Sequence, residues 1–177
     1  LDFGLAKAMD ATPGSASAAD LARSPTLMNS PTLTAVHGTQ LGVILGTAAA
    51  TDPAFVRRAV EEHAEAIVVA VDVRGGHVMV KGWQEEGPAL DDALPALDDA
   101  GAPRYLVTSI ARDGTLKGPD TKLYEHMLKL TQTPLIASGG VRDADDVWAL
   151  RELGCEAVVT GKALYEKTLK LAQVIRG

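Results

Sequence analysis

The 177-residue sequence has few of the residues that mark specialised protein classes. Its single cysteine, Cys155, excludes an internal disulfide framework and fits a reducing compartment, so we expect a cytoplasmic protein. No cluster of cysteine and histidine predicts a metal site, and no apolar run approaches the roughly 18 residues that span a bilayer. No basic and then apolar signal peptide opens the chain, and its first residue, Leu1, indicates a fragment of a longer reading frame.

Positive charge is also scarce. The 17 lysine and arginine residues face 23 aspartate and glutamate residues, which leaves a net charge of −6. This balance excludes a general affinity for nucleic acid or for an anionic membrane. A phosphate-bearing ligand would therefore have to be held by backbone donors and a few placed cations. Hydrophobic residues make up 46% of the chain, which is ordinary for a globular protein with a core of its own.

Two unlike regions divide the chain. Residues 10–40 are rich in serine, threonine, proline, alanine and glycine, and they show neither helical nor strand periodicity. Such a stretch cannot bury enough apolar surface to offset its ordering entropy, so we expect it to be disordered or loosely attached. We place the boundary so that residues 1–41 form an irregular tail and residues 42–177 form a domain.

From Leu41 onward, short apolar runs alternate with longer amphipathic stretches. This alternation predicts βαβ units and a parallel sheet, and therefore an α/β fold. We expect strands at 42–47, 66–73, 77–82, 104–110, 134–138 and 157–160, and the strand at 77–82 should form a hairpin with the one before it. We expect helices from residue 52 and at 87–100, 121–130, 143–153 and 169–175.

The carboxyl ends of the strands are the places to look for function, because chemistry in a parallel α/β barrel collects in the loops there. Glycines, hydroxyls and charged groups stand at these ends: Gly46, Thr47, Asp72, Arg74, Gly75, Gly76, Thr108, Asp113, Gly114, Thr115, Ser138, Gly139, Gly140, Gly161 and Lys162. Backbone N–H groups in glycine turns can wrap a phosphate, particularly before a helix, so 139–140 and 161–162 predict a phosphate site. The alternative is that these glycines only form tight turns.

Two carboxylates and a hydroxyl are candidates for proton transfer. Asp72 ends an otherwise apolar strand, where a carboxylate costs free energy unless it is hydrogen-bonded or functional, although it could instead cap the hairpin. Asp113 follows Thr108 closely, so a strand end and its loop could present both residues to one ligand. Trp83 closes the hairpin, where it could stack on a planar ligand or pack as a surface aromatic.

Four separated runs carry a family resemblance: VDVRGGHVMVKGW from Val71, then TSIARDGTLKGPD, PLIASGGVRD and VVTGKALYE. In order and spacing they resemble the carboxyl-terminal half of the ProFAR isomerases of histidine biosynthesis, over residues 42–177. The resemblance implies a partial (β/α)8 TIM barrel of about five βα units. It also implies an Amadori-type conversion of a small phosphoribosyl aminoaldose into an aminoketose, with no cofactor. Five strands cannot close such a barrel, so we expect self-association through open sheet edges.

The same resemblance implies roles for single residues. Asp72 matches the family's general acid or base, Thr108 matches the hydroxyl that assists it, and Asp113 is the third catalytic candidate. Matches to substrate- or phosphate-binding positions are Gly46, Thr47, Arg74, Gly75, Trp83, Gly114, Gly139, Gly140, Gly161 and Lys162. The family's second catalytic aspartate, on its first strand, and a glycine-rich loop after its third strand have no counterpart. We therefore expect little turnover from this polypeptide alone.

Residues 1–49 resemble another family, the bacterial Ser/Thr protein kinases. LDFGLAKAMD is similar to the segment whose Asp-Phe-Gly holds magnesium, with Asp2 at the ligand position, and GVILGTAA is similar to the end of an activation loop. No glycine-rich nucleotide loop, strand lysine or catalytic-loop aspartate accompanies them, so a working kinase is not expected. We interpret the chain as a chimera joined at 42–49 by recombination, fusion or sequence assembly.

Three alternatives to a single-substrate isomerase stay open. The first is a relative that also isomerises phosphoribosylanthranilate, and the second is a non-catalytic ribotide- or phosphate-binding half-barrel. The third is a kinase fragment with an unrelated tail, which is disfavoured because the isomerase resemblance covers more of the chain. The coding sequence upstream of Leu1 would discriminate among them.

Overall fold

The computed structural model describes residues 43–175, which form an α/β domain. The predicted disordered stretch at 10–40 and the boundary after residue 41 lie outside the described residues. None of the helices in the described range is long and apolar enough to cross a membrane.

Strands and helices alternate along the described chain, as the apolar pattern predicted. The strands are β1 (Val43–Leu45), β2 (Ile67–Arg74), β3 (His77–Val80), β4 (Glu85–Ala89), β5 (Tyr105–Ser109), β6 (Leu135–Ser138) and β7 (Ala157–Val159). The α-helices are α3 (Thr47–Thr51), α4 (Pro53–His63), α5 (Leu90–Asp99), α6 (Thr121–Leu130), α7 (Ala144–Leu153) and α8 (Lys162–Tyr165). Short 3₁₀ turns are η2 (Ala64–Ala66) and η3 (Leu171–Gln173).

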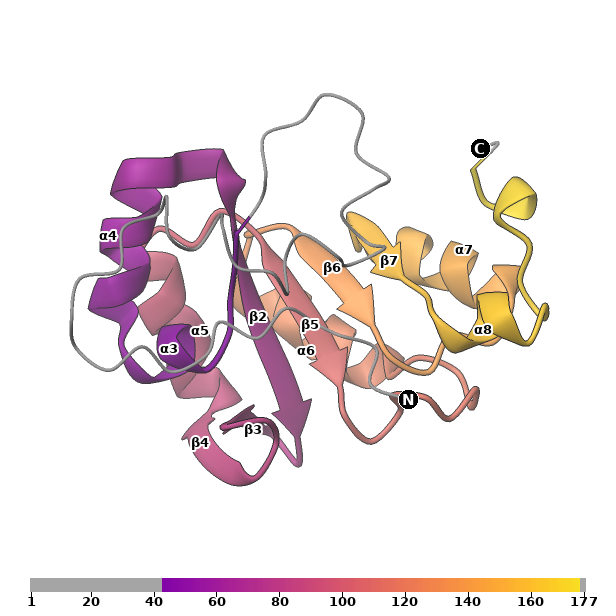
Figure 1. Cartoon of the computed structure of the whole chain (residues 1–177), viewed down its shortest axis with the longest axis horizontal. Helices are drawn as coiled ribbons and strands as arrows, with labels where there is room; N and C mark the ends of the chain where they lie inside the picture. Colours follow the sequence, from indigo (N-terminus) through magenta and orange to yellow (C-terminus); the bar gives the residue numbers. More distant parts are fainter. Residues whose placement is uncertain (1–42, 176–177) are drawn as a thin grey trace, which may run out of the picture.

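Five strands run parallel in the order β1, β2, β5, β6 and β7, and β3 and β4 add an antiparallel extension beside β2. Strand β2 is long enough to have two neighbours on one side, since its start pairs with β1 and its end pairs with β3. In Figure 1 the parallel strands β2, β5, β6 and β7 follow one another from left to right, with α4 at the left and α8 at the right. This topology confirms the α/β prediction and is consistent with part of a (β/α)8 barrel.

The two faces of the parallel strands differ in burial. Side chains on one face are at most 1% exposed and share a core with the helices; they form the layers Val69–Tyr105–Leu135 and Val71–Val107–Ala137. The opposite face carries Asp72 and Ser138, which are only partly buried. Removing the first face from water supplies the main driving force for folding, and the second face is the one that lines the interior of a complete barrel.

Local signals set the helix starts. Asp52 caps α4 by accepting a hydrogen bond from the Phe55 amide at 3.1 Å, and Pro53 stands in the first turn, as predicted. Asp120 caps α6 and Asp143 caps α7 in the same way. These three helices therefore begin where an aspartate satisfies an otherwise unpaired N–H group.

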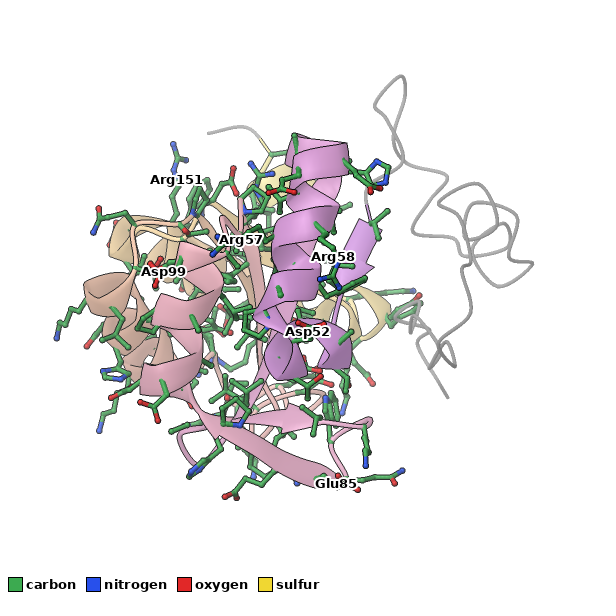
Figure 2. All side chains as sticks on the ribbon, turned by 90° about the vertical axis from the view of Figure 1, so that its left-hand side faces the viewer. Asp52, Arg57, Arg58, Glu85, Asp99 and Arg151 are labelled. Atoms are coloured by element: carbon green, nitrogen blue, oxygen red, sulfur yellow. The ribbon has the colours of Figure 1, made fainter. Side chains whose placement is uncertain are left out.

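A polar contact ties the first two long helices together (Figure 2). Arg57 of α4 donates from Nη2 to the carbonyl oxygen of Asp99, the last residue of α5, at 3.0 Å. The bond satisfies one of the carbonyl groups that a helix end leaves without an intrahelical partner.

The predicted helix at 87–100 was wrong at its start. Residues 85–89 form β4, and α5 begins at Leu90. A Cβ atom at Gly87 would stand 2.7 Å from the carbonyl oxygen of Val78, so the glycine permits a close approach of β4 to β3. Pro88 has no N–H group for a helix ladder, which also favours the extended form.

Two further boundaries differ from the prediction. The first strand ends at Leu45, and Thr47, predicted to be in that strand, begins α3. The predicted helix at 169–175 is present only as the 3₁₀ turn η3. Leu169 is buried, but Leu171 and Ile175 are 48% and 70% exposed, so this segment covers only part of its apolar side chains and gains less stabilisation for a longer helix.

Candidate active site

The carboxyl ends of β2, β5 and β6 place three polar residues in one row. Asp72 is the register partner of Thr108, and Thr108 is the register partner of Ser138. Neighbouring strands lie about 4.8 Å apart, and register partners on parallel strands point to the same face. The structure therefore brings Asp72 and Thr108 together. Ser138 joins them, although the prediction placed it at a strand end without including it in the site; its signal was the polar residue that ends an apolar strand.

The carboxylate of Asp72 has a fixed donor. Trp83 Nε1 donates a hydrogen bond to Asp72 Oδ2 at 2.7 Å. The Trp83 backbone lies in the left-handed region, with φ of 69°, and its carbonyl oxygen accepts from Arg74 Nη1 at 3.4 Å. A large non-glycine residue at positive φ is strained and persists only where its surroundings hold it. Stacking on a ligand and surface packing were the two expectations for Trp83; the structure adds that its indole N–H group is hydrogen-bonded to the Asp72 carboxylate, and stacking on a ligand stays a prediction.

A second contact joins the hairpin to the loop after β1. Thr47 Oγ1 accepts a hydrogen bond from the Lys81 amide at 3.0 Å. Gly46 precedes Thr47 at the start of α3, and its carbonyl oxygen accepts from the Ala49 amide at 2.9 Å. Because β1 and β3 both lie beside β2, Gly46 and Thr47 belong to the Trp83 side of the Asp72 row.

On the other side of the row, the loops after β5, β6 and β7 meet. The Gly118 amide donates to the carbonyl oxygen of Gly140 at 2.9 Å. Lys162 Nζ donates to the carbonyl oxygen of Gly114 at 2.8 Å. These contacts gather the loops that carry the predicted phosphate residues Asp113, Gly114, Gly139, Gly140, Gly161 and Lys162. Asp113 itself is exposed.

Packing requires glycine at some positions of these loops and not at others. A Cβ atom at Gly140 would stand 2.4 Å from the carbonyl oxygen of Gly118, and one at Gly139 would stand 2.9 Å from that of Ser109. Both glycines also have positive φ, at 99° and 87° for Gly139 and Gly140. Loop packing alone therefore demands glycine at these two positions. Gly161 differs, because its φ is −116° and a Cβ there would meet no atom within 4 Å.

The amino end of α7 is already occupied by carboxylates. The Arg142 amide donates to Asp146 Oδ2 at 2.9 Å, and the Asp146 amide donates to Asp143 Oδ1 at 3.2 Å. The helix start was expected to help hold a phosphate, but the N–H group of Arg142, just ahead of the helix, and that of Asp146, in its first turn, have partners of their own. Any anion in this region would therefore depend on the glycine turn ahead of the helix and on Gly161 and Lys162.

A pocket of about 320 Å³ lies beside the row, between the β2–β3 turn and α6. Its lining is Val73, Arg74, Gly75, Gly76, Ser109, Ala111, Asp120, Lys122, Leu123 and His126. Of the predicted site residues, Arg74 and Gly75 line this pocket and Asp72 and Thr108 do not. Val73 and Ser109, which point to the helix-covered face, contribute to the same lining, and Arg74 also reaches the Trp83 side of the row through its bond to the Trp83 carbonyl oxygen.

The described range was compared with what a metal site or a reactive thiol would need. Between residues 43 and 175, no group of three or more histidine, cysteine, aspartate or glutamate side chains could hold a metal ion. Cys155 is buried, and burial raises the pKa of its thiol to about 11. A thiol of that pKa is protonated at neutral pH and is a poor nucleophile.

The chain matches a sequence family described as "Histidine biosynthesis protein" over residues 36–170. That range contains every strand of the described sheet and every predicted site residue from Gly46 to Lys162.

Individual relatives are similar over the same part of the chain. A 1-(5-phosphoribosyl)-5-((5-phosphoribosylamino)methylideneamino)imidazole-4-carboxamide isomerase of Renibacterium salmoninarum is 43% identical over 136 residues, which is 75% of this chain and 56% of the relative. The enzyme of the same name from Paenarthrobacter aurescens is 41% identical over 77% of this chain and 58% of its own length. A phosphoribosyl isomerase A of Streptomyces griseus is 42% identical over 76% of this chain and 57% of its own length. The chain thus spans little more than half the length of these relatives.

Proposed function

The chain belongs to the histidine biosynthesis protein family, and we propose that it is part of an isomerase that converts a phosphoribosyl aminoaldose into an aminoketose. The observation that carries the proposal is the Asp72–Thr108 pair on neighbouring strands, flanked by glycine loops on both sides. The identity of more than 40% to relatives named as phosphoribosyl isomerases supports it.

The row at the strand ends suits the proton transfers of such a reaction. The ribose ring opens when its ring oxygen takes a proton and the bond from carbon 1 to that oxygen breaks, which leaves a carbon–nitrogen double bond at carbon 1. Carbon 2 then loses a proton to give an enolamine, and carbon 1 gains a proton as the hydroxyl on carbon 2 loses its own and becomes the ketone. In our proposal Asp72 carries protons to or from the substrate, and the Thr108 hydroxyl hydrogen-bonds beside it. Trp83 holds the Asp72 carboxylate in place through its indole N–H group. Asp113, in the loop after β5, is the further candidate for proton transfer.

The loops on both sides of the row suit a substrate with two anionic ends. The name of the Renibacterium relative specifies two phosphoribosyl groups, one at each end of the substrate. We propose that one phosphate lies among Gly114, Gly139, Gly140, Gly161 and Lys162, and the other beside Gly46 and Thr47. Arg74, Gly75 and Trp83 belong to the hairpin between these ends and are proposed as further binding residues.

A complete active site, in this proposal, needs the part of the relatives that the chain does not match. The test mixes the purified chain with the unmatched part of the Renibacterium isomerase and assays conversion of the aminoaldose to the aminoketose. We expect turnover in the mixture and a loss of about 10² to 10⁴-fold with Asp72→Asn. Asp92→Asn, at an exposed position on α5, is the control and should retain activity.

The outcomes of this assay separate the competing functions. Equal turnover with Asp72→Asn would overturn the assignment of Asp72. A mixture that binds inorganic phosphate but never turns over would favour a non-catalytic, phosphate-binding half-barrel. Full turnover from the chain by itself would show that the unmatched part is dispensable.

A broader specificity is the second candidate function. Relatives named phosphoribosyl isomerase A are 41% to 42% identical to the chain, which is close to the values for the imidazole-carboxamide isomerases. Similarity over the matched part therefore does not discriminate between one substrate and two. Assaying the same mixture with phosphoribosylanthranilate decides the question, because turnover of both substrates would show that the isomerase has two substrates.

A further proposal concerns the ends of the described sheet. The described residues contribute five parallel strands, too few to close an eight-stranded barrel, and Val43 of β1 and Val159 of β7 are 36% and 48% exposed, so we propose self-association of the isolated chain. A cooperatively folded monomer in sedimentation would contradict this.

The kinase-like origin of residues 1–49 is also a hypothesis. The end of that segment includes β1 and the start of α3, where Ala49 is fully buried. We further propose a cytoplasmic location, in keeping with a small-molecule phosphoribosyl substrate.

A further inference from the structure

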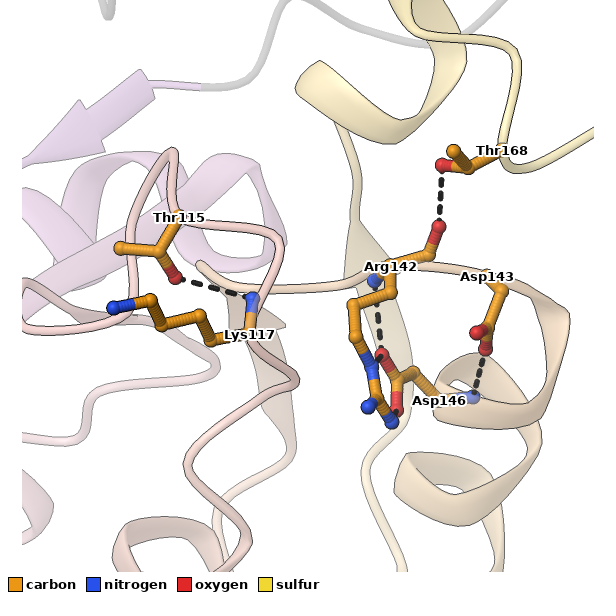
Figure 3. A network of polar contacts seen from close by, with 6 residues as sticks. All are labelled: Thr115, Lys117, Arg142, Asp143, Asp146 and Thr168. Carbon is orange, nitrogen blue, oxygen red and sulfur yellow. Dashed lines mark hydrogen bonds and ion pairs between the residues drawn. The ribbon is translucent and has the colours of Figure 1, made fainter.

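Arg142 is the centre of a polar network behind the three glycine loops (Figure 3). Its guanidinium donates from Nε to Asp146 Oδ2 at 2.8 Å and from Nη2 to Asp146 Oδ1 at 2.6 Å, in a two-bond fork. Its backbone amide donates to the same Oδ2 atom at 2.9 Å. One carboxylate therefore fixes both the side chain and the backbone of the residue that follows Gly140 by two positions.

The same residue also touches the two neighbouring loops. A Cβ atom at Gly118 would lie 3.4 Å from Arg142 Cζ, so the guanidinium packs against the loop after β5. Thr168, which follows α8, donates from Oγ1 to the carbonyl oxygen of Arg142 at 2.5 Å. Arg142 is thus a point where the loops after β5 and β6 meet the segment after β7.

Burial and charge make the pair with Asp146 firm. The Asp146 side chain is 7% exposed, whereas that of Arg142 is 50% exposed. Burial alone would raise the pKa of the Asp146 carboxyl, but the hydrogen bonds and the charge of Arg142 outweigh it and hold the pKa below its usual value. The carboxylate is therefore ionised at neutral pH, and without its arginine it would repel an anion bound at the adjacent turn.

We propose that Arg142, paired with Asp146, is a positioning residue that holds the 139–140 turn against the neighbouring loops in the geometry of an anion cradle. The inference rests on the proposed function, in which the anion is a substrate phosphate. It requires the planar fork of arginine and not only its charge, because two of its donors serve one carboxylate while the guanidinium packs against Gly118. Lysine would keep the charge and lose the fork.

The test uses the full chain and inorganic phosphate as the probe. The dissociation constant is measured by calorimetric titration well below the melting temperature, so that a loss of stability alone does not change it. We expect Arg142→Lys to weaken phosphate binding about tenfold, the lower end of what lost supporting hydrogen bonds cost around a bound ion. In the isomerase mixture the same variant should raise KM more than it lowers kcat.

Arg104 offers a matched control at the opposite edge of the sheet. Its Nε and Nη2 atoms form a comparable fork with Glu156, ahead of β5 and β7. Arg104→Lys breaks a fork of the same kind far from the glycine loops, so phosphate affinity should be unchanged. Thr168→Val removes the bond to the Arg142 carbonyl oxygen, together with a longer one to the Ala163 carbonyl oxygen at 3.3 Å, and serves as a second variant if Arg142→Lys does not fold.

The outcomes are distinguishable. Weaker phosphate binding in Arg142→Lys or Thr168→Val, with normal binding in Arg104→Lys, supports the positioning role. Equal affinity in the wild-type chain and in every folded variant overturns the positioning role and leaves the proposed function in place. If the wild-type chain binds no phosphate, then the cradle, and with it this inference, is wrong.

Discussion

The two edges of the parallel sheet belong to the same strands but use their polar groups differently. At the amino edge, a single oxygen, Asp98 Oδ1, accepts hydrogen bonds from the hydroxyls of Tyr105 at 2.8 Å and of Thr131 and Thr133 at 2.9 Å each. At the carboxyl edge, the described protein offers Asp72 one indole donor, Trp83. One acceptor thus gathers three hydroxyls at the amino edge, whereas in the described protein the Asp72 carboxylate at the carboxyl edge is paired with a single indole donor.

Burial follows the same division. Tyr105 is fully buried at the amino edge, and burial together with its bond to Asp98 raises the pKa of its phenol above the ordinary value. Most glycines with positive φ in the described chain belong to the carboxyl-edge turns, whereas Gly101 and Gly154 stand in helix-to-strand connections. In parallel α/β barrels the amino edge contributes stability and the loops at the carboxyl edge carry the chemistry, and the described sheet divides its buried polar cluster and its glycine turns between its two edges in the same way.

The strongest test of this division removes the amino-edge acceptor. Asp98→Ala leaves three hydroxyls without their shared acceptor, and we expect the free energy of unfolding to fall by about 3 kcal/mol. Urea denaturation measures the change. Asp99→Ala, at the exposed neighbouring position, should change it by no more than about 0.5 kcal/mol. Equal effects of the two variants would show that the cluster does not stabilise the edge.

A second test compares the arginine–carboxylate forks of the two edges. Asp146→Asn at the carboxyl edge should cost about 1–3 kcal/mol at pH 7, because Asp146 is buried. Glu156→Gln at the amino edge should cost about 0–1 kcal/mol, because that pair is more exposed and better screened. The side chains of Asp146 and Glu156 are 7% and 39% exposed.

The pH dependence of these two costs follows from their signs. Burial opposes ionisation of Asp146 but Arg142 outweighs it, and Arg104 acts likewise on Glu156, so both carboxyls have lowered pKa values. A carboxyl whose pKa is lowered by folding stabilises the folded state fully at a pH above its ordinary pKa, which is 3.8 for Asp146 and 4.5 for Glu156. This stabilisation is lost as the pH falls through the lowered pKa of the folded state. Urea denaturation from pH 7 to pH 2 should therefore show that the loss of unfolding free energy caused by each substitution becomes smaller as the pH falls. A cost that grows in acid would contradict the assignment.

A third test concerns the donor on Asp72. Trp83→Phe keeps an aromatic ring and removes the Nε1–H group, so the carboxylate loses its orienting bond. In the isomerase mixture we expect kcat to fall about tenfold, which corresponds to about 1.4 kcal/mol. Trp148→Phe, on α7, is the control and should retain activity. An unchanged kcat for Trp83→Phe would mean that the bond to Asp72 has no part in the reaction.

The smallest effect is expected at Gly161. A Cβ there meets no atom within 4 Å and φ is negative, so Gly161→Ala should raise the free energy of unfolding by about 0.4–1 kcal/mol. Gly140→Ala is the contrast, since its Cβ would clash with Gly118, and it should destabilise the chain. Destabilisation by Gly161→Ala would reveal a packing role for this glycine and weaken its assignment to a ligand site.

Much of the fold was predictable from local pattern. The apolar runs predicted the five parallel strands, and Asp52 and Asp143 marked two helix starts where the structure has them. The error at β4 arose because Gly87 and Pro88 stand in a stretch that continues into α5, and only the pairing with β3 decides where the helix begins. Local propensity cannot weigh such a long-range pairing.

The candidate site was predictable in its residue types but not in its geometry. Polar strand ends identified Asp72 and Thr108, yet the role of Trp83 depends on a hairpin turn with positive φ at Lys81, Gly82 and Trp83. That turn brings the indole N–H group within 2.7 Å of the carboxylate. Arg74 lines the neighbouring pocket and also donates to the carbonyl oxygen of Trp83, which its sequence position alone does not show.

The sequence by itself determined the α/β alternation, the caps, and the motifs that relate the chain to its family, because each depends on residues close together in the chain. Only the tertiary structure decided which of those residues meet. Strand register sets Asp72 beside Thr108, and the contacts of Arg142 join loops that are separate in the sequence. The physical reason is that register and loop contacts depend on side-chain packing across the whole sheet, which no single segment contains.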